Sequence, residues 1–270
     1  MSQASQKLIP GQRRFGRVNW LGLYTLIERE VKRFSSVWSQ TVLAPLITAA
    51  LFLLVFSLAI GSRRGDVMGV PFAHFLAPGI LMMTVMQNAF ANTASSLVIS
   101  KVQGNIVDTL MPPLSALELV VGYTAGGVLR GLAVAAAVML VTFPFLGLPV
   151  AHPLWALLFI LLGSVMLSLA GLLAGIVSNR FDQMSAITNF IVTPLSFLSG
   201  TFYSIDILPP GLRLVAHVNP IFYLIDGARF GVTGVSDRSP LLGAVVCAVL
   251  CVGMALWCWR WFATGYKLKS

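Results

Sequence analysis

The sequence is poor in charged residues. Asp, Glu, Lys and Arg make up only 10% of its 270 residues, against about 25% in typical soluble domains. Hydrophobic residues account for 57% of the chain, and the mean hydropathy is +0.87. So few charged side chains cannot cover the apolar surface that a soluble fold of this size would expose. The composition therefore predicts an integral membrane protein.

Acidic residues and cysteines are scarce. Nine acidic residues stand against 18 basic ones, which gives a net charge of +9. The basic residues lie between long apolar stretches rather than on one face, so we expect no nucleic-acid partner. Cys247, Cys251 and Cys258 share one face of an apolar segment without a nearby histidine. We expect them to be buried apolar residues, and we expect no metal site.

The sequence also lacks motifs that would supply chemistry or energy. It contains no G-x-x-x-x-G-K-[ST] stretch for ATP and no H-E-x-x-H zinc motif. The six apolar cores proposed below hold no Asp or Glu, although an ion-coupled secondary transporter usually places ionisable groups there. A lipid-modifying membrane enzyme would need Asp226, Arg229 and His217 to converge on one pocket. Both alternatives stay open, but we expect a chain that is not catalytic by itself.

Six segments are apolar enough to be candidate membrane spans. A hydrocarbon core about 30 Å thick needs ~20 apolar residues in a helix. The third segment is longer than that and contains Arg130, so we expect its helix to begin near Ser115 in water and Arg130 to lie at the membrane boundary. The fold class is therefore all-α and polytopic. The expected spans are residues 37–60, 72–97, 115–147, 154–177, 184–203 and 241–262.

The distribution of Lys and Arg predicts the orientation. With six spans and both termini inside, the inner segments hold 12 basic residues and the outer segments five. This excess predicts that both termini lie in the cytoplasm. We expect the membrane to be a bacterial inner membrane. The expected organisation is a cytoplasmic tail and amphipathic helix at residues 1–36, a transmembrane domain at 37–262 and a cytoplasmic tail at 263–270.

Residues 19–34 form the clearest amphipathic pattern. Trp20, Leu23, Tyr24 and other apolar residues recur at helical spacing, and charged residues crowd the other side, Glu30 and Arg33 among them. Asn19 is a suitable N-cap. We expect this helix to lie in the lipid interface on the cytoplasmic side. It serves either as a topology anchor or as a contact for a cytoplasmic partner.

Two connecting segments are more than simple loops. Residues 98–116 are partly helical in pattern until Met111-Pro112-Pro113 interrupts them, and Ser115 with Glu118 has the spacing of a capping box. Residues 204–237 are too apolar for a solvated loop, yet prolines divide them below spanning length. We expect two short re-entrant helices there, which form either a structural plug or an outer gate.

Polar and small residues within the spans allow two interpretations. Gln87, Asn88, Asn92 and Asn189 either line a pathway or form hydrogen bonds between helices. The glycine pairs 122/126, 127/131 and 171/175 would let helices approach closely. Such a bundle has no energy source of its own, so a separate cytoplasmic ATPase is the simplest expectation.

Three stretches of the sequence point to a family. They are EREVKRF at 28–34, LMPPLSALELVVG at 110–122 and FLSGTFYSIDILPPGLRLVAHVNPIFYLIDGARFG at 197–231. The chain resembles the type-2 permease subunits of ATP-binding-cassette exporters, which include permeases for nodulation lipo-oligosaccharides, O-antigen polysaccharides and drugs. The resemblance implies a homodimer in membrane lipid, with two ATPase subunits. It implies no cofactor in this chain, because the partner binds ATP and Mg.

The resemblance also implies roles for individual residues. The loop at 101–110 would be the coupling helix, flanked by the amphipathic helix, and residues near 202–220 would form the outer gate. The implied function is export of an amphiphilic, lipid-linked, glycan or drug-like substrate. The expected coupling residues are Lys101, Gln103, Gly104, Asn105, Asp108, Leu110, Glu28 and Arg29, and the expected gate residues are Phe202, Tyr203, Pro209, Pro210, Asn219 and Pro220.

Overall fold

The computed structural model describes residues 18–61, 65–110 and 113–268. These residues are almost entirely helical and contain no β-strand, which confirms the all-α class. Three short segments, η1, η2 and η3, are π-helical, and η4 is a 3₁₀ turn. The longer elements are α1 (Trp20–Ser35), α2 (Ala44–Phe56), α4 (Phe72–Val102), α6 (Ala116–Leu146), α7 (Pro153–Val177), α11 (Pro220–Thr233) and α12 (Pro240–Thr264). The shorter ones are η1 (Ser39–Leu43), η2 (Ser57–Gly61), α5 (Ile106–Leu110), α8 (Phe181–Ile187), η3 (Thr188–Val192), α9 (Thr193–Phe197), η4 (Ile205–Ile207) and α10 (Pro210–Val218).

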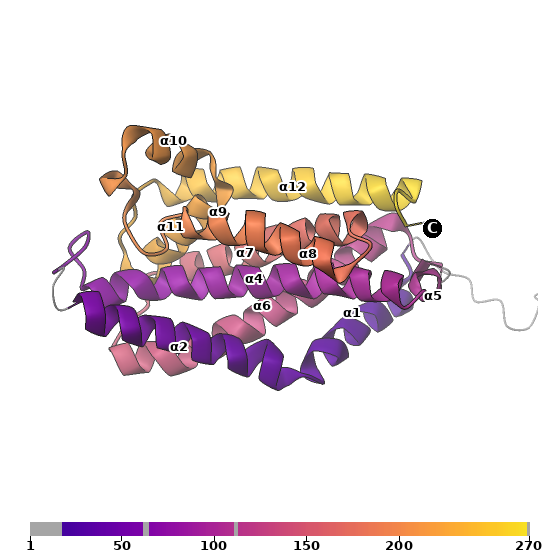
Figure 1. Ribbon diagram of the computed structural model, residues 1–270, viewed down its shortest axis with the longest axis horizontal. Coiled ribbons are helices and arrows are strands. Elements are labelled where there is room, and N and C mark those ends of the chain that lie inside the picture. Colours follow the sequence, from indigo (N-terminus) through magenta and orange to yellow (C-terminus); the bar gives the residue numbers. More distant parts are fainter. Residues whose placement is uncertain (1–17, 62–64, 111–112, 269–270) are drawn as a thin grey trace, which may run out of the picture.

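The helices form an elongated bundle (Figure 1). α4 and α12 run along its length, and α5 and the last described residues lie at one end. α10 lies at the opposite end, near the loop that precedes α4. We call these the α5 end and the α10 end. The residues expected to couple to an ATPase and those expected to form a gate therefore lie at opposite ends of the molecule.

Among the described residues, four helices are long and apolar enough to cross a membrane: Ser39–Ala59, Ala116–Leu146, Pro153–Val177 and Pro240–Thr264. The other two expected spans are helical but differ from these four. α4 has 31 residues, but it carries many polar side chains and is mostly buried by other helices. The fifth expected span was wrong in its extent, because its helix runs from Phe181 to Phe197 rather than to Tyr203. The count of six stays a prediction.

The three glycine pairs are contact points, and each faces a different neighbour. A Cβ at Gly171 would overlap the carbonyl oxygen of Phe90, and Gly175 lies against α4 one turn further on. Gly127 and Gly131 face serines of α7 in the same close manner. Because these residues have no side chain, the backbones of α4, α6 and α7 approach closely and form the core of the bundle.

α1 packs against the third glycine pair, Gly122 and Gly126. The amphipathic pattern placed Glu30 on the wrong face of this helix. Leu26 packs on Gly122, and Glu30 packs on Gly126, so α1 lies against α6. Trp20 and Tyr24 are 72% and 64% exposed, whereas Glu30 is fully buried. The buried stripe includes Glu30 because its charge is neutralised inside the protein. The expected cap is present, since Asn19 Oδ1 accepts a hydrogen bond from the Gly22 amide at 2.9 Å.

Local signals placed the other short elements correctly. Ser115 and Glu118 form the expected capping box, in which Ser115 Oγ accepts from the Glu118 amide and the Glu118 carboxylate accepts from the Ser115 amide. The two short helices expected within 204–237 are α10 and α11, and a proline starts each of them.

Candidate functional site

The coupling residues form an exposed turn and helix at the α5 end. Gly104 has a φ of +73°, which lets the chain reverse after α4 and enter α5. Gln103, Gly104, Asn105 and Asp108 are exposed, and Ile106 anchors the turn because it is only 7% exposed. The Leu110 side chain lies outside the part that the structure describes. The structure thus brings four of the six expected loop residues together on one accessible surface.

Lys101 has a different position from these four. Its ammonium donates to the carbonyl oxygens of Ile176 and Ser178, the latter at 3.2 Å. These carbonyls lie at the C-terminus of α7, where the helix leaves acceptors unpaired and favours positive charge. Burial, with a smaller contribution from the neighbouring Lys267, lowers the pKa of Lys101 to about 8. Lys101 therefore joins α4 to α7, beside a cavity of about 340 Å³ that Gly104 and Lys267 also line.

Glu28 and Arg29 on α1 differ in the contacts that their side chains form. Glu28 forms an exposed ion pair with Lys32 at 2.6 Å. Arg29 is held within the subunit, because its guanidinium contacts Glu30 and donates to the Tyr123 hydroxyl of α6, both at 3.1 Å. The two side chains are similarly exposed, 39% for Glu28 and 43% for Arg29, and Arg29 also fastens α1 to α6.

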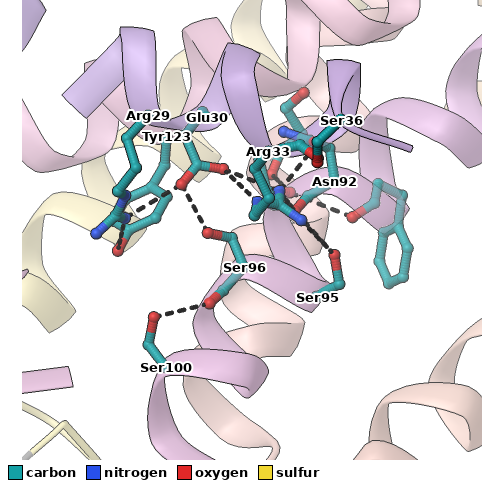
Figure 2. Close-up of polar contacts among 12 residues, drawn as sticks. Arg29, Glu30, Arg33, Ser36, Asn92, Ser95, Ser96, Ser100 and Tyr123 are labelled. Atoms are coloured by element: carbon teal, nitrogen blue, oxygen red, sulfur yellow. Dashed lines mark hydrogen bonds and ion pairs between the residues drawn. The ribbon is translucent and has the colours of Figure 1, made fainter. Parts of the chain in front are cut away.

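A buried polar cluster joins α1, α4 and α6 (Figure 2). At its centre is the Glu30 carboxylate, whose side chain is 0% exposed and pairs with Arg33 at 2.9 Å and with Arg29. Ser96 Oγ donates to Glu30 at 2.7 Å. Arg33 donates further to Asn92 Oδ1 at 2.9 Å and to the Asn92 carbonyl at 2.7 Å. Three helices are thus connected by charge-assisted hydrogen bonds, which are stronger than neutral ones.

The amphipathic pattern alone did not reveal this cluster. Leu23, Leu26, Glu30 and Phe34 recur at spacings of three or four, so Glu30 belongs to the stripe that α1 buries. The sequence signal was the small residue Gly126, which leaves room for a carboxylate on the facing helix. An amphipathic pattern assigns charged residues to the solvent face of a helix, so it cannot reveal a charged residue that is buried and paired.

The residues expected to line a pathway are not brought to one cavity. Asn88 and Asn92 are buried and are used within the subunit, since Asn88 Oδ1 accepts from Arg130 at 2.9 Å and Asn92 accepts from Arg33. Gln87 is half-buried on α4. Asn189 is exposed in η3. The hydrogen-bonding interpretation therefore accounts for Asn88 and Asn92, whereas Gln87 and Asn189 keep the pathway interpretation as a prediction.

Aromatic side chains surround the first two gate residues at the α10 end. The Phe202 ring lies 5.0 Å from that of Phe56 and 5.5 Å from that of Phe197, and it also contacts Phe52. The Tyr203 hydroxyl donates to the Phe197 carbonyl at 3.2 Å. The turn after α9 is thus packed against α2 by aromatic contacts, each worth about 0.5–1.5 kcal/mol.

The other four gate residues start helices. Pro209 and Pro210 are exposed at the beginning of α10. Asn219 is buried and caps α11, and its amide nitrogen donates to Leu195 O at 2.8 Å and Ser199 Oγ at 2.7 Å. Pro220 occupies the first position of α11. The caps position the short helices, and no contact among these residues by itself indicates gating.

Asp226 and Arg229 form part of a buried ionic cluster. Arg229 is fully buried, lies 3.6 Å from Asp226 and 3.8 Å from Asp237, and donates to the Gly200 carbonyl at 2.6 Å. Asp226 also accepts the Asp237 and Arg238 amides. His217 does not join this cluster, because its ring contacts Arg238 and Phe222 instead. The three residues of a lipid-modifying enzyme do not converge on an open pocket.

Comparison with known proteins identifies the family of this chain. A family model described as ABC-2 type transporter matches residues 22–232, from α1 to the end of α11. The chain belongs to the ABC-2 type transporter family. It is 38% identical to the inner membrane transport permease YadH of Escherichia coli K12 over 93% of this chain and 98% of that protein. It is 26% identical to Nodulation protein J of Rhizobium leguminosarum bv. viciae over 79% of this chain and 82% of that protein.

Membership in the ABC-2 family confirms the resemblance seen in the sequence. The chain is a multi-pass inner membrane protein and the transmembrane permease subunit of a transporter. The family implies a partner that binds ATP, and this agrees with a chain that lacks a P-loop sequence.

Proposed function

We propose that the chain is the permease subunit of an exporter driven by ATP that a separate subunit hydrolyses. Two copies of the chain would combine with two ATPase subunits. The α5 end would face the cytoplasm, together with both termini. The substrate would be an amphiphilic, lipid-linked, glycan or drug-like molecule that leaves at the α10 end.

The observation that carries the proposal is the exposed turn at Gln103–Asp108. It lies at the end of α4, a continuous helix of 31 residues that contacts most of the bundle. A force applied to α5 would therefore reach the α10 end through a rigid element rather than through a loop. The side chains offered there are mainly polar and uncharged, with one carboxylate at Asp108, and they suit a groove of hydrogen-bonding groups on a partner.

The class of substrate is supported by the groove between α2 and α6. This groove has a volume of about 370 Å³ and is lined almost entirely by apolar side chains, among them Leu53, Val141 and Phe145. It lies near the α10 end of both helices. An apolar groove facing lipid fits a hydrocarbon chain better than an ion. α2 is also poorly covered within one subunit, with 11% of its spanning stretch buried, which leaves room for lipid or a second copy.

Docking of the ATPase can be tested with charge reversal at the α5 turn. We expect Asp108→Arg, and the double variant Gln103→Ala with Asn105→Ala, to reduce co-purification of the ATPase subunit and its stimulation in vesicles. Asp66→Arg is the matched control, because Asp66 is an exposed acid that precedes α4, whereas α5 follows the other end of that helix. All variants should insert into the membrane like the wild type.

Two results would contradict the proposal. If the α5 variants kept full binding and stimulation while Asp66→Arg lost them, the docking surface and the orientation would both be wrong. If transport in cells continued after ATP depletion and stopped with an uncoupler, the chain would be an ion-coupled transporter instead. The second measurement needs no variant, so it does not depend on the assignment of α5.

A further inference from the structure

Arg130 lies near the middle of α6 and close to one edge of the membrane. It is 16 residues before Leu146, the last residue of the helix, which corresponds to about 24 Å along the axis. With Leu146 at one boundary of a hydrocarbon core about 30 Å thick, Arg130 lies about 6 Å inside the other boundary. The length of an arginine side chain spans that distance. Its guanidinium can therefore reach the lipid headgroups on the α5 side.

Within the described residues, Arg130 has no acidic partner. One of its terminal nitrogens donates to the neutral Asn88 Oδ1 at 2.9 Å, and its Nε is buried without any partner. The nearest acid in the neighbouring cluster is Glu30, whose oxygens are occupied by Arg29, Arg33 and Ser96. Arg33 and Arg130 repel each other. The region between α1, α4 and α6 thus carries three arginines and one glutamate.

Uncompensated positive charge at this depth requires an anion. A charged guanidinium in an apolar environment is costly unless it is paired. A counter-ion would therefore stabilise the charged form of Arg130. Asn92 supplies no counter-ion, because the residue is 0% exposed and its Nδ2 is a buried donor without a partner. Asn92 Oδ1 is held by Arg33, so this nitrogen is directed away from Arg33, toward Gly126 of α6.

We propose that Arg130, within the positive field of Arg33, binds the phosphate group of an anionic phospholipid in the leaflet at the α5 end. Arginine binds phosphate through two parallel N–H donors, which Arg130 still has available. The site is reachable from the lipid, since Arg130 is only half-buried and the adjacent Leu129 is 40% exposed.

The proposal can be tested in nanodiscs of defined composition. We expect the wild-type permease to unfold at a higher temperature in phosphatidylcholine with phosphatidylglycerol than in phosphatidylcholine alone. Native mass spectrometry should show retained phosphatidylglycerol, and Arg130→Gln should reduce this retention about tenfold, as expected when one charge-assisted contact is lost. Arg260→Gln is the matched control, because Arg260 is an exposed arginine near the end of α12 and lies outside the cluster. It should keep both effects.

Three outcomes would overturn the proposal. If the wild type were equally stable in both lipid mixtures, the proposed lipid site would be disproved without any variant. An equal stabilisation by inorganic phosphate in phosphatidylcholine nanodiscs would show that the ligand is a free anion rather than a lipid. If Arg130→Gln instead dissociated a dimer in phosphatidylcholine alone, the counter-ion would be a carboxylate of a second copy. None of these measurements involves ATP hydrolysis, so their result is independent of the proposed transport function.

Discussion

Replacing Glu30 by glutamine tests the central role of the buried polar cluster. The substitution keeps the shape of the side chain but removes its charge, and it leaves Arg29 and Arg33 without their acidic partner. Breaking a fully buried ion pair costs about 3–5 kcal/mol. Arg29 and Arg33 are 43% and 27% exposed, so water can partly solvate them once Glu30 is neutral. We therefore expect a loss of about 2–3 kcal/mol in the free energy of unfolding.

Thermal unfolding of the purified permease in detergent measures this loss. A change of 1 kcal/mol shifts the melting temperature by about 2–4 °C for 150–250 residues, so Glu30→Gln should lower it by about 4–12 °C. Glu28→Gln is a matched control on the same helix. Its ion pair with Lys32 is exposed, and such pairs contribute about 0–1 kcal/mol. The control should therefore lower the melting temperature by less than about 4 °C.

Equal shifts in the two variants would refute the reasoning. They would mean that the Glu30 carboxylate is no better stabilised by its neighbours than an exposed carboxylate on the surface of α1. A Glu30→Gln protein that melted like the wild type would show in addition that α1 is held to α6 by its apolar contacts alone.

Two further predictions follow from contacts elsewhere. Gly171→Ala should destabilise the permease by about 1–3 kcal/mol, because the new methyl group overlaps the Phe90 carbonyl. Gly253→Ala is the control and should be neutral or stabilising, because no atom lies within 4 Å of the new methyl group. Chemical unfolding of both variants measures the difference. The pKa of Lys101 is lowered to about 8 from 10.5, so between these values the unfolded chain binds more protons and stability should rise with pH. Lys101→Met should flatten this rise in melting curves recorded from pH 8 to 10.5, and an unchanged slope would contradict the assignment.

Much of the fold follows from short stretches of sequence. The beginning of α6 follows from the capping residue Ser115, whose partner lies three residues away, and the beginning of α11 follows from Pro220. Apolar length identified the four span-capable helices, because the thickness of a bilayer sets that length. The glycine pairs were correctly recognised as close contacts, although their partners were not.

The features that could not be predicted depend on residues far apart in the chain. Glu30 accepts a hydrogen bond from Ser96, 66 positions away, and Arg130 contacts Asn88 across 42 positions. No local pattern encodes which helices face each other, so a buried charge was interpreted as a solvated one. The same limit applied to α4, whose asparagines allowed either a pathway or hydrogen bonds between helices until their partners Arg33 and Arg130 were located.

The coupling and gate residues show the same division. Gly104 and Asp108 could be placed in a partly helical connecting loop from the local pattern, and the family resemblance implied that they contact a partner. Lys101 could not be recognised as a cap for α7, because its acceptors at Ile176 and Ser178 follow 75 and 77 positions later. Neighbouring residues in one motif can thus differ in role, one holding two helices together and the others facing outward.

The backbone contact between α4 and α7 has a mechanical consequence. Where Gly171 meets the Phe90 carbonyl, no layer of side chains separates the two helices that could repack as they slide. The pair must then move as a single lever during any transport cycle, with α5 at its tip. Relative displacement is left to the loosely covered segments around the lever, α2 and the chain from α8 to α9, whose π-helical turns already depart from regular helix geometry.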